Sequence, residues 1–334
     1  MTDVVLAARD LRVAFRRGRD WAEVVRGIDL SVAAGETLAI VGKSGCGKSV
    51  TALSLVGLLP VTARIVAGST ELLGRPLSGL PEREARALRG NRISIIFQDP
   101  SSALNPVLTI GEHLNDAILA HRDIGRSAAR AEASTLLAQV RLPAPAYMLD
   151  VYPHQLFGGM RQRVLIAMAI ANQPDVLIAD EPTTALDATV QHEIRLLLRD
   201  IQVRTGMAML LITHDLELVA QWADRVLVMY AGTRVEERDA SSIPHSLLHP
   251  YSRALVESRP QRRSANGHRQ RLRELAGAPP ELGAAHQGCA FASRCSEVRA
   301  RCADDSPPVI ELQDGAVACH VVAERRAETD GRVS

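Results

Sequence analysis

The stretch Gly42-Lys43-Ser44-Gly45-Cys46-Gly47-Lys48-Ser49 decides the fold of this chain, together with the apolar run Thr37 to Val41 directly before it. The apolar run is typical of a strand buried on both faces. After such a strand, the glycines let backbone N–H groups point at phosphate oxygens, and the next helix adds its positive N-terminal end. In this pattern the lysine reaches the outer phosphates and the serine binds Mg²⁺. The stretch, extended to Val50, therefore predicts a nucleotide site, in which Cys46 is a small filler.

The rest of the first 258 residues predicts an α/β fold. Helical patterns follow Lys48 and cover Met160 to Asn172 and Ala188 to Gln202. Their alternation with strands indicates a mainly parallel sheet with helices on both sides. From about Asp99 the pattern changes to helices without strands, which we interpret as a helical insertion. Beyond Thr37 to Val41, the predicted strands are Arg92 to Phe97, Asp175 to Ala179, Ala208 to Thr213 and Arg225 to Tyr230.

Length and charge limit the possible functions. The 334 residues are enough for one large domain and a smaller module. Lysine and arginine number 39 against 38 aspartate and glutamate, so no global charge points to nucleic acid. Since no apolar run approaches the ~20 residues of a membrane helix, we expect a soluble cytosolic chain. We see no internal repeat.

Polar residues follow three of the predicted strands. Asp180 and Glu181 end the run that begins at Val176, and we expect this strand to neighbour the one that delivers the phosphate loop. Asp180 would hold Mg²⁺ through water, and Glu181 would polarise the attacking water. Gln98 and His214 also directly follow strands. Because open parallel sheets bind ligands at the carboxyl ends of their strands, a common site is favoured over structural roles.

A second glycine motif, Leu156-Phe157-Gly158-Gly159-Met160, precedes the run Arg161-Gln162-Arg163 and a predicted helix. Together with the phosphate loop and the two acids, it resembles the signature of ABC transporter nucleotide-binding subunits, and the resemblance extends from Leu6 to His320. It implies a RecA-like P-loop NTPase core of the ABC type at 1–258, with a helical subdomain at about 99–165.

The resemblance also implies roles for individual residues. Two such subunits stack head to tail, so that each ATP lies between the Walker A loop of one chain and the signature, including Phe157, Gly158 and Gly159, of the other. The catalytic residues would be Lys48, Gln98, Glu181 and His214. The Mg²⁺ ligands would be Ser49, Gln98 and Asp180. The remaining matches are Gly42 to Ser49 as the Walker A loop, Gln98 as the Q-loop, Asp180 and Glu181 as the Walker B pair, Ala185-Leu186-Asp187 as the D-loop and His214 as the switch histidine.

Adenine stacking in this family uses an aromatic residue upstream of the Walker A loop. Phe15, which we place just after the first strand, is our choice for this residue. Trp21 is the second choice.

Two further motifs are similar to the dipeptide and oligopeptide importer branch, which also includes nickel systems. They are Phe97 to Pro106 and His249-Pro250-Tyr251-Ser252-Arg253-Ala254-Leu255. The branch implies an ATPase that powers import of a small solute, above all peptides, from the cytoplasmic face of the inner membrane. Its partners would be a second ABC ATPase subunit, two membrane-spanning permeases and an extracytoplasmic solute-binding protein, without nucleic acid. The alternatives are import of nickel, opines or another small solute, a non-transport ABC ATPase, and a redox sensor that uses the cysteine-rich tail.

Phe157 stands where the family signature has serine, whose hydroxyl donates a hydrogen bond to the γ-phosphate on the partner. A phenyl ring cannot donate this bond, and the loss of such a contact typically costs about a hundredfold in rate. We therefore expect an asymmetric heterodimer, in which the partner's signature completes the site on this chain's own Walker A loop. In the alternative, Phe157 turns aside and both sites work.

Four of the five cysteines crowd into the C-terminal part, at Cys289, Cys295, Cys302 and Cys319. In a cytosolic chain such clustering suggests a metal rather than disulfides. Spacing alone leaves zinc and iron–sulfur open. The branch's C-terminal extension holds a [4Fe-4S] cluster in some members, so the resemblance favours that cluster, with Zn²⁺ or free thiols as alternatives. We assign 259–278 to a solvated linker, although its arginines could touch lipid or nucleic acid, and 279–334 to the cysteine-rich extension.

Overall fold

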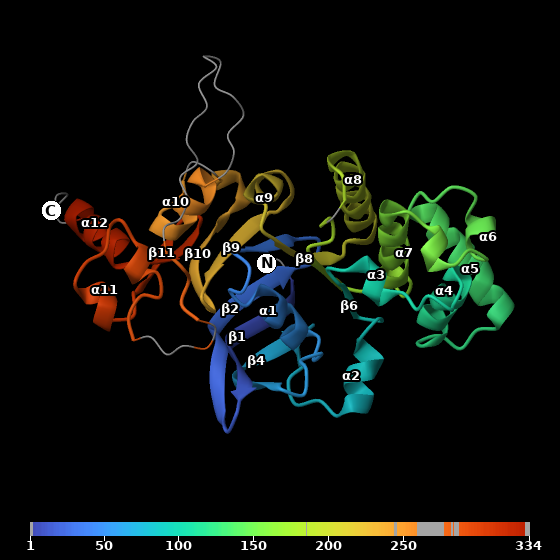
Figure 1. Cartoon of the computed structure of the whole chain (residues 1–334), viewed down its shortest axis with the longest axis horizontal. Helices are drawn as coiled ribbons and strands as arrows, with labels where there is room; N and C mark the ends of the chain where they lie inside the picture. Colours follow the sequence, from blue (N-terminus) through green and yellow to red (C-terminus); the bar gives the residue numbers. More distant parts are fainter. Residues whose placement is uncertain are drawn as a thin grey trace, which may run out of the picture.

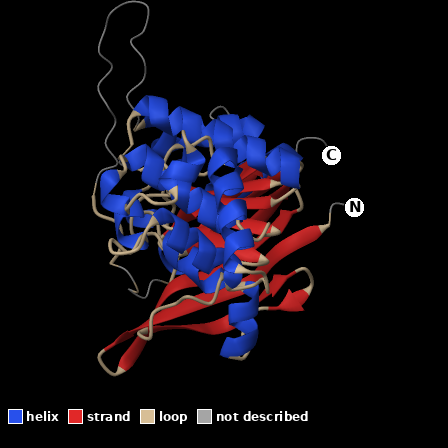
Figure 2. Cartoon of the chain, turned by 90° about the vertical axis from the view of Figure 1, so that its right-hand side faces the viewer, coloured by secondary structure: helices blue, strands red, loops and turns tan. Residues whose placement is uncertain are grey.

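The computed structural model describes residues 3–184, 186–243, 246–258, 277–281, 283 and 287–330. Their strands form two sheets, and most helices gather on one side of the strands (Figures 1 and 2). Most of the predicted linker lies outside the described residues. The strands are β1 (Val4–Arg17), β2 (Asp20–Ala33), β3 (Thr37–Val41), β4 (Ala63–Leu72), β5 (Arg75–Pro76), β6 (Ile93–Ile96), β7 (Val176–Asp180), β8 (Ala208–Thr213), β9 (Arg225–Tyr230), β10 (Thr233–Asp239), β11 (Val309–Leu312) and β12 (Gly315–Ala318).

The larger sheet has the strand order β11-β12-β10-β9-β3-β8-β7-β6. Its centre, from β9 to β6, is parallel, with Ala39 opposite Leu211 and Ile178 opposite Leu210. We expected the strand that ends at the two acids, β7, to neighbour the strand that delivers the phosphate loop, β3. This expectation was wrong, because β8 lies between them. The strand that carries His214 thus separates the phosphate loop from the two acids.

Strands at the centre of this sheet are buried on both faces. On β3, Leu38 and Ile40 join the core formed with β1 and β2, whereas Ala39 and Val41 face the core that includes Tyr230 and Tyr251. Such two-sided burial explains their continuous apolar sequence.

The smaller sheet is antiparallel, with the order β2-β1-β4-β5. Helix α1 (Lys48–Leu55) contacts β1, β2, β4 and β7, so it lies between the two sheets. Helices therefore lie on both faces of the larger sheet, as expected, but the face that carries α1 is also covered by a second sheet that the sequence did not predict. Phe15 lies inside β1 rather than after it, since β1 continues to Arg17.

The helical part runs without an intervening strand from residue 100 to residue 170 of the described chain. Helix α4 begins with a capping box, in which Thr109 and Glu112 each accept a hydrogen bond from the other's backbone N–H. The helices of this part are α3 (Pro100–Ala103), α4 (Ile110–Leu119), α5 (Arg126–Gln139), α6 (Pro145–Met148), η1 (Pro153–Gln155) and α7 (Gly158–Ile170).

The C-terminal part is joined to the larger sheet. Strand β12 pairs antiparallel with β10, with Val317 opposite Glu236, and β11 then forms the edge. No helix among the described residues is both long and apolar enough to span a membrane. The remaining helices are α2 (Glu82–Leu88), α8 (Ala188–Thr205), α9 (Leu216–Trp222), η2 (Ala240–Ser242), α10 (Pro250–Glu257), η3 (Ala292–Arg294), α11 (Arg301–Asp304) and α12 (His320–Asp330).

Candidate functional site

The loop between β3 and α1 is held by its own lysine. The Lys48 Nζ atom is buried and donates to the Gly42 carbonyl oxygen at 2.7 Å. Gly42 has no room for a side chain, because a Cβ atom would lie 2.4 Å from the Met229 carbonyl oxygen and 2.6 Å from Cys46 Sγ. Gly47 has φ +105°, a conformation that glycine adopts at little cost. The buried Cys46 thiol, whose pKa is raised by burial, packs against Gly42 as a filler.

Glu181 is the centre of a hydrogen-bond network at the carboxyl ends of the parallel strands. Gln98 Nε2 donates to Glu181 Oε2 at 2.9 Å, and His214 Nδ1 lies 3.2 Å from Oε1. Thr184 Oγ1 also donates to Oε2, at 2.9 Å. The structure therefore brings together Gln98, Glu181 and His214, which sequence reasoning placed at one sheet edge. Thr184 was missed, although a hydroxyl three residues after Glu181 is visible in the sequence.

The charge and backbone of Glu181 both bear on its chemistry. Burial raises the pKa of Glu181, but hydrogen bonds from Thr184 and His214 outweigh it and leave the pKa below its usual range. The carboxylate is therefore ionised at neutral pH and can accept a proton from water. Glu181 also has φ +46°, a left-handed conformation that costs about 1–2 kcal/mol in a non-glycine residue.

Asp180 offers a site suited to Mg²⁺. Burial is the main cause of its raised pKa, and a hydrogen bond from Ser49 opposes the shift. Its Oδ1 atom is buried without a hydrogen-bond partner in the described chain. A buried carboxylate oxygen without a partner, beside a serine hydroxyl, matches the oxygen ligands that Mg²⁺ prefers. These two residues thus fit the ion.

A pocket of about 590 Å³ opens beside the loop. Its lining includes Gly42, Lys43 and Ser44 on one side and Glu181 and His214 on the other. Phe15 and Trp21 lie on β1 and β2, outside this lining. Trp21 is instead covered by the Arg64 guanidinium, which lies 4.0 Å from the ring centroid.

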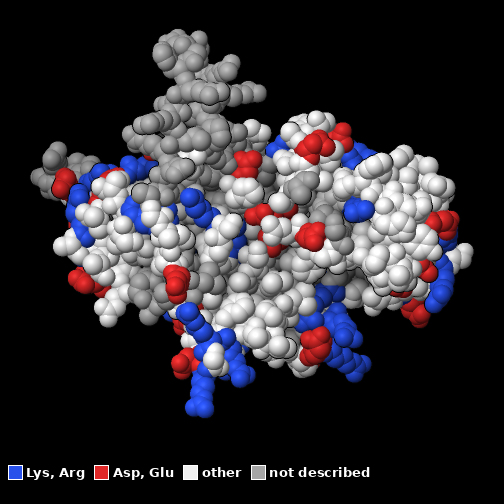
Figure 3. All heavy atoms as spheres, in the orientation of Figure 1, with Lys and Arg blue, Asp and Glu red and all other residues white. Residues whose placement is uncertain are grey.

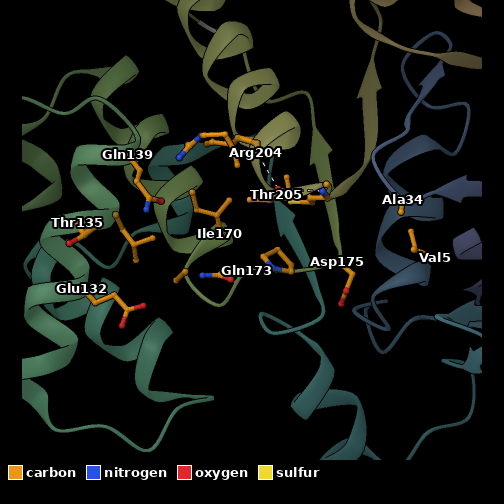
Figure 4. A pocket seen from close by; sticks show the side chains of 16 residues that line it. Val5, Ala34, Glu132, Thr135, Gln139, Ile170, Gln173, Asp175, Arg204 and Thr205 are labelled. Carbon is orange, nitrogen blue, oxygen red and sulfur yellow. Dashed lines mark hydrogen bonds between the residues drawn. The ribbon is translucent and has the colours of Figure 1, made fainter. Parts of the chain in front are cut away.

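A second pocket, of about 530 Å³, lies at the opposite edge of the sheet (Figure 4). Asp175 and Met207, which line it, directly precede β7 and β8, so it faces the amino ends of these strands. Glu132, Thr135 and Gln139 of α5 form its other wall. Because Gln98, Glu181 and His214 all follow the carboxyl ends of strands, this second pocket is separate from their network.

The signature residues lie at the start of α7, in the helical part. Phe157 is the N-cap of α7, makes no side-chain cap hydrogen bond and is 81% exposed. Gly159 packs against α8, where a Cβ atom would come within 2.6 Å of Val190 Cγ1. Figure 1 shows α7 beside α4 and α5, apart from α1 and the Walker A loop. Phe157 therefore projects from the surface rather than over this chain's own loop.

Asp187 has a local role in the structure. Its Oδ1 atom accepts hydrogen bonds from the backbone N–H groups of Thr189 and Val190, both at 3.0 Å, and so caps α8. Ala185 of the predicted D-loop lies outside the described residues.

Charged side chains mix over much of the face drawn in Figure 3, but positive ones gather at two places. One is the tip of the β1–β2 hairpin, where Arg16, Arg17 and Arg19 are exposed. The other is α2, with exposed Arg83 and Arg86. Neither belongs to the network around Glu181.

The four C-terminal cysteines are free thiols, and they are close enough to influence one another's titration. Burial raises the pKa of Cys289 and Cys295 to about 11, and the charges of Cys302 and Cys319 add to both shifts. Nevertheless, no three His, Cys, Asp or Glu side chains of the described ranges form a group that could hold a metal ion. The structure thus gives no support to the predicted [4Fe-4S] cluster or to its Zn²⁺ alternative, because sequence clustering did not produce a ligand geometry.

Comparison with known proteins agrees with this geometry. A family profile described as "ABC transporter" matches residues 25–184, and one described as "Oligopeptide/dipeptide transporter, C-terminal region" matches residues 235–302. The dipeptide transport ATP-binding protein DppD of Bacillus subtilis is 47% identical over 292 residues, which cover 87% of this chain and 86% of the relative. The chain belongs to the ABC transporter family. Within that family it is an ATP-binding subunit of the dipeptide and oligopeptide branch, and an ATPase.

Other relatives and solved structures give the same assignment. The oligopeptide transport ATP-binding protein OppD of Escherichia coli K12 is 42% identical over 95% of this chain and 93% of its own length. A solved dimer of the bacterial ABC transporter cassette MJ0796 superposes with a TM-score of 0.63 at 26% identity, covering 70% of this chain and 98% of the cassette. That cassette was solved as a dimer, and the ATPase core of this chain has the same fold.

Proposed function

We propose that this chain binds ATP and Mg²⁺ at its Walker A loop and hydrolyses ATP to power import of di- or oligopeptides. The observation that carries the proposal is the network in which Gln98 and His214 both hydrogen-bond to Glu181, next to the pocket lined by the loop. The relatives named DppD and OppD support the peptide as the solute. Permeases, a second ATPase and a solute-binding protein would complete the importer at the cytoplasmic face of the membrane.

The residues divide the reaction between them. Lys48 would leave the Gly42 carbonyl oxygen to reach the outer phosphates, and Ser49 with Asp180 would hold the Mg²⁺ that neutralises phosphate charge, joined by Gln98. The ionised Glu181 would then accept a proton from the attacking water, while His214 and Gln98 orient the Glu181 carboxylate. We propose Phe15 as the aromatic residue that stacks on the adenine.

Uptake of labelled dipeptide into cells tests the proposal. Cells that carry the intact chain should accumulate the label, and cells that carry Lys48→Ala should not, although the variant reaches the membrane with its permeases. Normal uptake in Lys48→Ala cells would contradict the proposed motor. If neither strain takes up the labelled dipeptide but cells with the intact chain take up nickel, the assignment to this importer branch holds. The imported solute is then nickel and not a peptide.

We also propose that the chain works in an unequal pair. Phe157 is exposed where a partner's γ-phosphate would approach, and it has no hydroxyl to donate. The partner's intact signature would complete the site on this chain's Walker A loop, together with residues such as Asp187, and the other site would be slow. ATPase assays of the assembled complex with Glu181→Gln, set against the same change in the partner, test this asymmetry; equal losses contradict it.

The [4Fe-4S] cluster stays a prediction that rests on resemblance. Elemental analysis of anaerobically purified protein tests it, because the cluster requires iron and acid-labile sulfide in equal amounts. Zinc without iron would favour the alternative, and neither metal would leave four free thiols.

A further inference from the structure

A tyrosine outside the nucleotide motifs contacts the Walker A loop. The Tyr251 hydroxyl accepts a hydrogen bond from the Lys43 backbone N–H at 3.0 Å. Tyr251 lies in the first turn of α10, about 200 residues after the loop in the sequence, and its side chain is fully buried. The hydrogen bond is partly buried, because Lys43 lies at the surface whereas the tyrosine ring is enclosed, and this enclosure fixes the position of the hydroxyl.

The Lys43 N–H belongs to the same peptide group as the Gly42 carbonyl oxygen, to which Lys48 Nζ donates at 2.7 Å. A peptide group is planar and trans, so its N–H and C=O point in opposite directions. Tyr251 and Lys48 therefore hold the two sides of a single peptide plane. If the N–H is fixed by Tyr251, the direction of the carbonyl that holds the lysine is fixed as well.

Tyr251 is in turn positioned by the N-cap of its own helix, His249. His249 Nδ1 accepts a hydrogen bond from the Tyr251 backbone N–H at 3.0 Å. The backbone N–H groups of Leu248 and His249 donate to the buried Glu236 carboxylate, at 2.7 and 3.1 Å. Glu236 lies on β10, directly opposite Val317 of β12. The support of Tyr251 thus reaches the C-terminal strand pair.

The C-terminal part also covers the tyrosine ring. Phe291, two residues after Cys289, is 2% exposed and packs against Tyr251 with ring centroids 5.4 Å apart. Tyr230 completes the cluster, 4.6 Å from Tyr251 and 5.2 Å from Phe291. Such tilted and edge-to-face pairs are favourable beyond the area they bury.

We propose that Tyr251 is a positioning residue for Lys48, and that the C-terminal part, through Phe291, keeps Tyr251 in place. The hydroxyl orients the Gly42–Lys43 peptide so that the lysine is held ready beside the phosphate site. Contacts that begin in the cysteine-rich extension therefore set the affinity of the nucleotide site. The inference rests on the proposed ATP binding at this loop and adds a function for the extension that needs no metal.

Two matched variants of the full chain test the inference. Tyr251→Phe keeps the ring and removes the hydroxyl that contacts the loop. Tyr230→Phe removes a hydroxyl from the same buried cluster, but that hydroxyl accepts from Arg294 Nη1 at 3.3 Å and does not contact the loop. We expect Tyr251→Phe to weaken MgATP binding about fivefold, which corresponds to about 1 kcal/mol, and Tyr230→Phe to leave the affinity unchanged.

Amide hydrogen exchange at Lys43 without nucleotide gives a direct second readout. Exchange at this amide should be at least several times faster in Tyr251→Phe than in the wild type or in Tyr230→Phe, while the melting temperatures of the two variants stay similar. If both variants weaken MgATP binding equally, the cluster is merely structural and the inference fails. If Lys43 exchanges equally fast in all three proteins, the hydrogen bond does not hold the loop and the inference also fails.

The role of the C-terminal part is tested with Phe291→Leu, which removes the aromatic contact and keeps an apolar side chain. It should weaken MgATP binding in the same direction as Tyr251→Phe, and the double variant should be no weaker than Tyr251→Phe alone. Additive losses would overturn the coupling. A wild-type chain that does not bind MgATP would reject the proposed function instead, and Lys43 exchange would still decide between the positioning role and its absence.

Discussion

The Walker A loop and the signature motif are both glycine-containing turns that open a helix, but the chain surrounds them differently. The loop is held by its own Lys48 and enclosed by Met229 and Tyr251, which come from two distant parts of the sequence. The signature presents Phe157 at 81% exposure, while Gly159 packs against Val190 of α8. The difference shows that the loop is packed against other parts of its own chain, whereas the signature is exposed, which agrees with the proposed contact to another chain.

The largest expected effect concerns the enclosed site. Glu181→Gln should lower the ATPase rate of the assembled complex at least about a hundredfold, because the amide cannot accept a proton from water. MgATP binding should persist, since Lys48 and Ser49 remain. Steady-state phosphate release and nucleotide binding measure the two effects. Asp200→Asn, an exposed acid of α8, is the control and should change neither; an equally slow Asp200→Asn complex would argue against a specific role of Glu181.

Phe157→Ser should act on the exposed motif. A serine hydroxyl could donate to the partner's γ-phosphate, so the slow site should gain about tenfold or more in ATPase rate when the fast site carries Glu181→Gln. Serine is also a favourable N-cap, and α7 should gain about 0.5–2 kcal/mol in unfolding free energy. The two effects are separable, because the stability gain is measured on the isolated chain. A gain in stability without a gain in rate would contradict the unequal pair.

Gly159→Ala should destabilise the chain more than Gly158→Ala does. The first introduces a Cβ atom 2.6 Å from Val190 Cγ1 and should lower the unfolding free energy by about 1–3 kcal/mol. The second meets Leu186 Cδ2 at 3.3 Å, and the higher helix propensity of alanine offsets this contact. Urea unfolding of the two variants measures the contrast. Equal losses would mean that α7 is not packed on α8 at this point.

The smallest expected effect concerns the support of the enclosed loop. Burial lowers the pKa of His249 to about 3, against about 6.5 in an unfolded chain. Between these values the unfolded state binds the extra proton, so stability falls as the pH falls from about 6.5, by up to about 1.4 kcal/mol per pH unit. In His249→Asn the amide oxygen can still cap α10, and this dependence should disappear. Urea unfolding at pH 5, 6 and 7 tests it; parallel slopes would contradict a buried neutral histidine.

Local sequence patterns predicted the central strands well. The bounds of Thr37–Val41, Ala208–Thr213 and Arg225–Tyr230 agree with the structure, because uninterrupted apolar runs next to turn residues have few alternatives. The order of these strands was not visible in the sequence, and β8 separates two strands that we expected to be neighbours. The β1–β2–β4 sheet was also missed. Its pairing is broken by register shifts at several points, which disturb the alternation that identifies a half-buried strand.

Candidate site residues were visible wherever the chemistry is local. Gln98, Glu181 and His214 each follow a strand, and parallel strands bring such residues to one edge. Thr184 and Tyr251 needed the structure, since a hydroxyl or a ring has no sequence signal for the group it contacts. The cysteines are a sequence signal without the expected site, because four thiols that are close in sequence did not form a metal-binding group among the described residues.

The sequence by itself determined the class of ATPase and the identity of the residues at its phosphate loop, because glycines, lysine and serine at that spacing satisfy a demanding local geometry. The tertiary structure decided which strands meet, that the C-terminal strands extend the ATPase sheet, and that Tyr251 holds the loop while Phe157 faces outward. These outcomes depend on packing between segments up to hundreds of residues apart, and neither periodicity nor a local motif records such contacts.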